Sequence, residues 1–175
     1  ILKDGIPKLE IAVVAAETVA DQVKAAVAGW PFRVHLVEGE GAKRDAMKAS
    51  TAALACSGTV SIELALAGTP MVIAYRLGWL SFAIMSRVIK PPYITLFNIA
   101  AGREAAPEFL QDKAVPMDMA KAVALPIMFP EERARQVEAQ YAALEALGRP
   151  ERDPSEAAAE AVIRVLETGA ISRAG

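Results

Sequence analysis

The sequence contains little of what several common kinds of site require. It has one cysteine, one histidine and 6% aromatic residues in 175 positions. Cys56 has no second cysteine for an internal disulfide, and His35 alone cannot form a multi-histidine metal site. No apolar run reaches about 18 residues, and the N-terminus lacks the order of a signal peptide. We therefore expect a cytoplasmic protein without a membrane-spanning helix.

The net charge is also small, at −2 from 19 basic and 21 acidic residues. This balance lacks the positive surplus that non-specific nucleic-acid binding requires. The chain has no Asp-x-Asp pair to hold magnesium, and Arg44 replaces the third glycine of a Gly-x-Gly-x-x-Gly fingerprint that would start at Gly39. These absences predict no nucleic-acid partner, no metal and no cofactor. A phosphate-bearing ligand would need a local site.

Hydrophobic residues make up 54% of the chain, and 36 of them are alanine. In the first 75 residues, short apolar runs typical of buried strands alternate with helical patterns. The predicted strands cover 10–15, 33–37, 52–56 and 71–75, and the predicted helices cover 18–28, 43–48 and 60–67. This alternation indicates a right-handed, mostly parallel sheet with helices on both faces. The fold class is therefore α/β and Rossmann-like, followed by C-terminal helices.

The second half of the sequence predicts one more strand and several helices. An apolar helix over 78–89 is either buried or faces a membrane or a partner. An extended segment over 93–97 leads to Asn98, and a short helix is expected around 106–111. From residue 117 onward the pattern is helical, with an amphipathic helix over 131–147. A final helix, opened by a capping box, is expected to bury Val162, Val165 and Leu166.

Ser57, Gly58 and Thr59 form a turn between a predicted strand and a predicted helix. Free backbone N–H groups and the helix dipole favour an anion at such a turn. In open α/β sheets, ligands bind at the carboxyl ends of the strands, which is where this turn lies. Ordinary helix capping by the two hydroxyls explains the same residues. Cys56, beside the turn, is expected to be a small buried side chain.

Glu63 follows the turn by one helical turn and is the only acidic residue between Thr51 and Ala101. A lone carboxylate on an apolar helix is costly to bury without a partner. It can accept hydrogen bonds from both hydroxyls of a ribose. The alternative is an ion pair with Arg76 or Arg87.

A third group of polar residues, Asn98 with Gly102, Arg103 and Glu104, is predicted in a loop. The amide of Asn98 both donates and accepts hydrogen bonds, and the guanidinium of Arg103 suits a phosphate or a carboxylate. Gly102 permits an unusual backbone angle. The local sequence equally allows an ordinary turn in which Arg103 pairs with a neighbouring carboxylate.

Two stretches carry a resemblance to a known family. Residues 55–76 read Ala-Cys-Ser-Gly-Thr-Val-Ser-Ile-Glu and onward to Tyr-Arg, and residues 93–104 end in Asn-Ile-Ala-Ala-Gly-Arg-Glu. The first pattern recurs in related sugar-nucleotide transferases, whereas the second is more specific. From about Val34 onward the chain resembles the C-terminal half of lipid-A-disaccharide synthase, a bacterial glycosyltransferase of the GT-B type.

The resemblance implies transfer of diacylglucosamine from its UDP donor to diacylglucosamine 1-phosphate, giving lipid A disaccharide 1-phosphate and UDP. It implies an inverting reaction without a metal, with the chain on the cytoplasmic side of a Gram-negative inner membrane. The membrane surface and a second copy of the chain are further candidate partners. The implied nucleotide-binding residues are Ser57, Gly58, Thr59, Glu63, Asn98, Gly102, Arg103 and Glu104.

The chain starts at Ile1, and no residue before Ile11 matches the Gly-Ser-Arg motif that this family carries after its first strand. We expect residues 1–128 to form a donor-nucleotide-binding domain that lacks this strand and loop. Residues 129–175 are expected to be helices that pack on it or on an absent N-terminal domain. The resemblance places the general base in that absent domain, so the fragment has no catalytic residue and is expected to be inactive.

Two other functions stay open from the sequence. One is a non-catalytic nucleotide-sugar-binding or interaction module of the same fold. The other is a different nucleotide-sugar enzyme, such as an epimerase, which would share the turn at 57–59 but not the pattern at 98–104.

Overall fold

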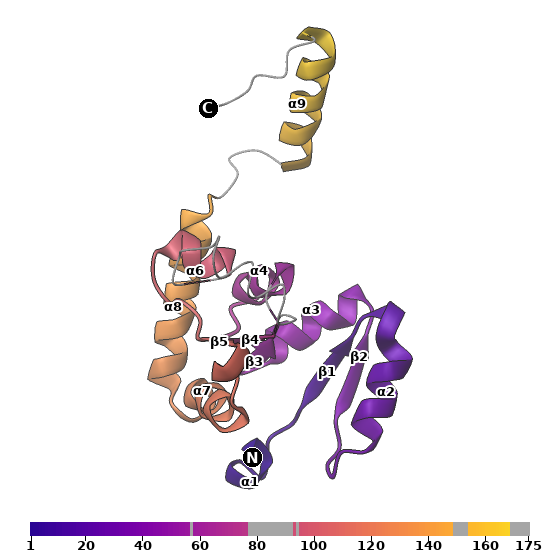
Figure 1. The fold of residues 1–175 in the computed structure, drawn as a ribbon, viewed down its shortest axis with the longest axis vertical. Coiled ribbons are helices and arrows are strands. Elements are labelled where there is room, and N and C mark those ends of the chain that lie inside the picture. The colour runs from indigo at the N-terminus through magenta and orange to yellow at the C-terminus, as the bar shows by residue number, and fades with distance from the viewer. Residues whose placement is uncertain (57, 77–92, 94, 149–153, 169–175) are drawn as a thin grey trace.

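The computed structural model describes residues 1–56, 58–76, 93, 95–148 and 154–168. Ser57 and the predicted apolar helix over 78–89 lie outside the described residues. Figure 1 shows strands in the centre, helices on both sides of them and one helix, α9 (Pro154–Thr168), away from the rest. The predicted class, α/β with parallel strands and a Rossmann-like arrangement, is confirmed.

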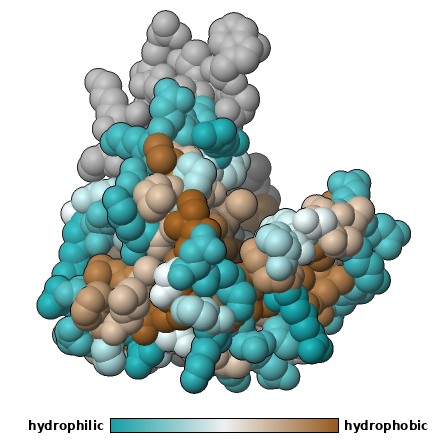
Figure 2. All heavy atoms as spheres, turned by 90° about the horizontal axis from the view of Figure 1, so that it is seen from below, coloured by the Kyte–Doolittle hydropathy of each residue, from teal (hydrophilic) through white to brown (hydrophobic). Residues whose placement is uncertain are grey.

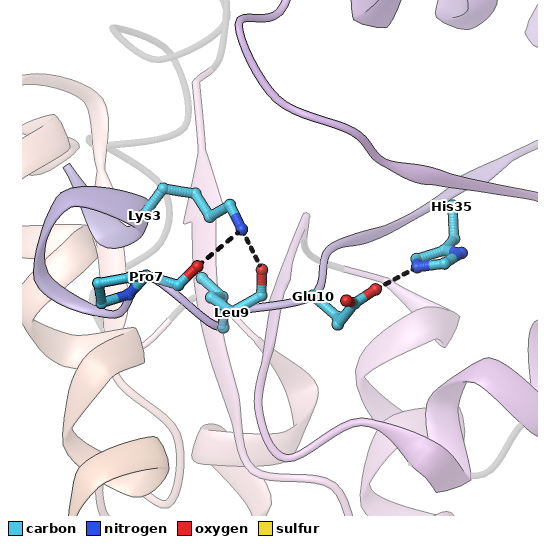
Figure 3. Close-up of polar contacts among 5 residues, drawn as sticks. All are labelled: Lys3, Pro7, Leu9, Glu10 and His35. Carbon is cyan, nitrogen blue, oxygen red and sulfur yellow. Dashed lines mark hydrogen bonds and ion pairs between the residues drawn. The ribbon is translucent and has the colours of Figure 1, made fainter.

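The first sheet has two parallel strands, β1 (Ala12–Ala15) and β2 (His35–Glu38). A parallel pair needs a crossover, and here it is a 3-10 turn followed by α2 (Ala20–Ala28). A short helix, α1 (Leu2–Gly5), precedes β1. Lys3 ties it to the segment before β1, because its Nζ donates to the carbonyl oxygens of Pro7 at 3.3 Å and Leu9 at 2.6 Å (Figure 3).

The second sheet has three parallel strands in the order β3 (Ala53–Ala55), β4 (Met71–Tyr75) and β5 (Glu108–Leu110). α3 (Glu40–Ala49) leads from β2 to β3, and α4 (Thr59–Leu66) connects β3 to β4. The central strand β4 carries the core, since Met71, Val72 and Ile73 are at most 1% exposed. Both of its bounds match the predicted strand.

The two sheets are separate among the described residues, and β1 lies on the side of β2 that faces β3 (Figure 1). In the part of the chain that the structure describes, neither β1 nor β3 pairs with a strand on its facing edge. The strand predicted over 10–15 was expected to be buried on both faces, but Val14 is 43% exposed. In β3, Leu54 is 55% exposed, and Cys56 just after it is exposed rather than buried as predicted.

Two predictions after β4 are wrong. The segment expected to be extended becomes helical from Leu96, in α6 (Leu96–Ala101), so that Asn98 lies in a helix rather than in a loop. The hydroxyl of Thr95 caps this helix by accepting from the Asn98 backbone N–H. The helix expected around 106–111 is instead β5, because the free edge of β4 accepts it as a parallel partner, with Ile73 opposite Glu108.

The chain ends in long helices, α7 (Pro116–Met128), α8 (Pro130–Ala146) and α9. α8 packs against α4, α6 and α7. Gln140 of α8 is fully buried, where its amide donates to Thr69 O at 3.0 Å and accepts from the Met71 N–H at 3.2 Å. Gln136 donates to Met71 O at 2.5 Å, so that two glutamines fasten α8 to the first residue of β4.

The apolar side chains of α9 were predicted to be buried, but they are exposed. Val162, Val165 and Leu166 are 60%, 42% and 78% exposed, because the helix lies away from the sheets (Figure 1). Viewed from below, the molecule also exposes hydrophobic patches between its hydrophilic side chains (Figure 2). Within the described ranges, no helix has the length and apolar character needed to cross a bilayer.

Candidate functional site

The turn after β3 is open at the start of α4. Gly58 is the N-cap residue, with φ 124° and ψ −157°, a backbone conformation that is reached almost only by glycine. Among the described residues, no side chain caps the helix, and a Cβ placed on Gly58 would meet no atom within 4 Å. Gly58 and Thr59 are both exposed. This end of the helix is therefore free to receive an anion on its backbone N–H groups.

Glu63 lies one turn into α4 and pairs with Lys43 of α3. Lys43 Nζ donates to Glu63 Oε1 at 3.2 Å and lies 3.2 Å from Oε2. Glu63 Oε2 itself is buried and has no hydrogen-bond partner in the described structure. The ion pair expected with Arg76 does not form, because the Arg76 guanidinium donates to Ala114 O at 3.5 Å instead, and Arg87 lies outside the described residues.

Lys43 is the centre of a three-residue charge cluster. Its Nζ also lies 2.7 Å from the Glu40 carboxylate. The hydrogen bonds to Glu40 and then Glu63 raise the pKa of Lys43 above its ordinary value of 10.5. Lys43 was missed in the sequence, although it lies four residues before the buried Met47 and therefore on the same inward helix face.

Asn98 of α6 is fully buried, and its amide is hydrogen-bonded within the chain. Its Nδ2 donates to Ala106 O at 2.7 Å and to Glu108 Oε1 at 2.8 Å, while its Oδ1 accepts from the N–H groups of Ala105 at 2.8 Å and Ala106 at 3.0 Å. Glu108 also accepts from the backbone N–H and the hydroxyl of Thr95. This network joins the start of α6 to the start of β5.

The residues between α6 and β5 are held by this network. Gly102 ends α6 in the left-handed conformation, with φ 61°. Arg103 and Glu104 are exposed, and Glu104 Oε1 accepts from the Glu108 N–H at 3.3 Å. Asn98 thus serves to position this loop, and whether it contacts a ligand stays a prediction.

The predicted residues form two groups rather than one. Gly58 follows β3 and lies at the carboxyl end of this strand, and Glu63, one turn into α4, contacts Lys43 of α3. Gly102 to Glu104 precede β5 and lie at the opposite, amino ends. The structure therefore brings Gly58, Thr59 and Glu63 together and places the second group elsewhere.

The single histidine of the sequence pairs with an acidic side chain. His35, at the start of β2, is half exposed, and its Nε2 is bonded to the Glu10 carboxylate (Figure 3). The hydrogen bond to His35, together with its charge, lowers the pKa of Glu10 below its ordinary 4.5. No group of three or more His, Cys, Asp or Glu side chains able to hold a metal occurs in the part of the chain that the structure describes.

The parallel strands, the crossover helices and the open turn at a strand's carboxyl end define a Rossmann-like α/β domain. Residues 1–162 match the family model described as lipid-A-disaccharide synthetase. The chain belongs to this family.

Curated relatives agree with the family assignment. The chain is 41% identical over 166 residues to the lipid-A-disaccharide synthase of Rhodospirillum centenum, with 95% of the chain and 41% of that protein covered. It is 39% identical over 165 residues to the synthase of Nitrobacter winogradskyi (94% and 42% covered) and 38% identical over 177 residues to that of Paramagnetospirillum magneticum (100% and 45% covered). The chain thus spans about two fifths of the length of these relatives.

Proposed function

We propose that the chain is the donor-nucleotide-binding part of an enzyme that transfers diacylglucosamine from UDP to diacylglucosamine 1-phosphate. The observation that carries this proposal is the uncapped turn at Gly58 with the Glu63 carboxylate one helical turn away. The backbone N–H groups of the turn suit a diphosphate, and the carboxylate suits a ribose diol. The two acylated sugars of the proposal come from the resemblance to the family, and membership of that family supports them.

The proposed reaction inverts the anomeric carbon. A base on the acceptor side removes the proton of the attacking hydroxyl, the new C–O bond forms, and the bond to UDP breaks with its electron pair leaving on the phosphate oxygen. The start of α4 stabilises the charge on the departing diphosphate, and the Thr59 hydroxyl adds a donor. This side of the reaction needs no metal, because backbone N–H groups supply the electrostatic stabilisation.

The base would come from a further domain, so that residues 1–175 alone would not catalyse transfer. The separate sheets support this division of the protein. In a Rossmann-like sheet, the first strand lies between the second and the fourth. In this proposal β1 and β3 take those two positions, which agrees with their facing edges having no partner strand among the described residues. We place between them a strand that ends in the Gly-Ser-Arg loop of the family, beside the turn at Gly58.

The acylated substrates suggest where the enzyme works. A protein that takes two lipid-linked sugars gains access to them at a bilayer surface, so we propose a cytoplasmic enzyme that binds peripherally at the inner membrane. The apolar helix predicted over 78–89, a candidate for such a contact, lies outside the described residues. Self-association is a further proposal that the relatives' names leave open.

The test is calorimetry of UDP binding to the full-length protein that contains this chain. Wild type is expected to bind UDP, and Glu63→Ala to bind it at least about tenfold more weakly, because a hydrogen bond to a charged group contributes about 1.5–3 kcal/mol. Glu145→Ala, an exposed acid on α8, is the control and keeps wild-type affinity.

Four possible results decide between these hypotheses. A folded protein that does not bind UDP, or a Glu63→Ala variant that binds like wild type, overturns the proposed donor site. UDP binding without any transfer of diacylglucosamine by the full-length protein supports the non-catalytic module instead. Transfer by the 175-residue chain alone would refute the proposed location of the base.

A further inference from the structure

We propose that Lys43 is the residue that positions the Glu63 carboxylate for recognition of a ribose diol. This inference rests on the proposed function and adds a residue to its site. Lys43 comes from a different helix, 20 residues earlier in the chain, and reaches both carboxylate oxygens of Glu63 at 3.2 Å.

The burial of the pair shows why a partner is needed. The side chain of Lys43 is 16% exposed and that of Glu63 is 38% exposed. Glu63 is the only charged residue of α4. A carboxylate in this position loses part of its hydration, which favours either neutralisation or rotation of the side chain toward solvent. The ammonium group of Lys43 opposes both outcomes, because it stabilises the charged form in one orientation.

The hydrogen bonds of Glu63 leave room for a ligand. A carboxylate can accept about four hydrogen bonds, and Lys43 uses one position on Oε1. Oε2 makes none within the described residues, although it is buried. Oε2 lies 3.2 Å from the Lys43 ammonium group but accepts no hydrogen bond from the described residues, and a hydroxyl donor would supply one. The two hydroxyls of a ribose are donors of the right number for such a carboxylate.

Glu40 competes with Glu63 for the ammonium group of Lys43. Its carboxylate is 78% exposed and lies 2.7 Å from Lys43 Nζ, closer than either oxygen of Glu63. Two acids therefore share one ammonium group, and removal of the exposed acid leaves Lys43 to Glu63 alone. The variant Glu40→Gln should keep or increase the discrimination that Glu63 provides.

The experiment compares UDP with 2′-deoxy-UDP, which lacks one of the two hydroxyls. Calorimetry on the full-length protein at low salt gives the ratio of the two dissociation constants for each variant. Wild type should prefer UDP by about tenfold or more. Lys43→Met should lower this preference to about threefold or less, while Lys43→Arg restores most of it.

Two controls separate positioning from folding. Lys48→Met removes an exposed charge from the same helix and should leave the ratio unchanged. In a Glu63→Gln background, Lys43→Met should cause no further loss, because a residue that acts through Glu63 has nothing left to position. Thermal unfolding of every variant shows which ones remain folded.

The outcomes are distinct. A reduced ratio in Lys43→Met that is absent in the Glu63→Gln background supports the inference. An unchanged ratio in a folded Lys43→Met variant overturns it, and so does an equal loss in both backgrounds. If Lys43→Met does not fold, the ratio in Glu40→Gln decides, since a fall there contradicts the proposed role. Failure of wild type to bind UDP at all refutes the proposed function itself.

Discussion

Asn98→Ala should be among the most destabilising single substitutions in this chain. Asn98 is 0% exposed and makes four side-chain hydrogen bonds between α6 and the start of β5. Truncation leaves the N–H groups of Ala105 and Ala106 without acceptors at positions that are 3% and 0% exposed. Each orphaned buried group costs about 1–3 kcal/mol, so we expect a loss of about 3–5 kcal/mol in the free energy of unfolding.

Urea unfolding of the 175-residue chain, followed by far-UV circular dichroism, measures this loss. With an m value of about 2 kcal/mol/M, the midpoint should fall by about 1.5–2.5 M. Gln22→Ala, at an exposed position of α2, is the control and should change the free energy by less than about 0.5 kcal/mol. A loss below about 1 kcal/mol in Asn98→Ala would refute the reasoning.

Asn98→Asp tests the direction of the same hydrogen bonds. Aspartate keeps the acceptor for Ala105 and Ala106 but turns an oxygen toward Ala106 O and the Glu108 carboxylate. The neighbouring acid should raise the pKa of Asp at this position in the folded state. Its penalty is then absent below the unfolded pKa near about 3.9 and grows as the pH rises above it. Destabilisation that does not increase with pH would contradict this assignment.

Three further predictions concern other contacts. Gln140→Leu should cost about 2–4 kcal/mol in urea unfolding, because its buried amide serves two backbone groups of the β4 start. Gly68→Ala should destabilise, since a Cβ there lies 2.7 Å from the Tyr141 hydroxyl and φ is 71°, and Tyr141→Phe should relieve part of the loss. NMR titration of Glu10 should give a pKa below 4.5 that rises in His35→Gln. The contribution of the Glu10 carboxylate to stability is therefore lost as the pH falls from 4.5 through the folded pKa.

The strands and helices up to Tyr75 could be predicted because their signals are local. β4 is a continuous apolar run after a proline, and its neighbours in the chain mark both ends. The segment after it could not be assigned this way. The cap of α6 depends on β5, because Thr95 is hydrogen-bonded to Glu108, 13 residues later. β5 in turn depends on the free edge of β4, with which it pairs.

The candidate site, too, could be predicted from the sequence only in part. Glu63 stands out in the sequence as a lone acid on an apolar helix, whereas Lys43 becomes visible only when α3 and α4 pack. Gly102 and Arg103 read as part of one site with Gly58 because their patterns occur together in one family. The order of the strands separates them, since one group follows a strand and the other precedes one.

The facing edges of β1 and β3 have a consequence for the chain in solution. An unpaired strand edge presents a row of N–H and C=O groups that can pair with an extended segment of any polypeptide. Val14 of β1 and Leu54 of β3 are exposed, and they add apolar surface next to these two edges. The edge that would complete the sheet therefore also offers a route to β-aggregation, which a strand paired at that position would close.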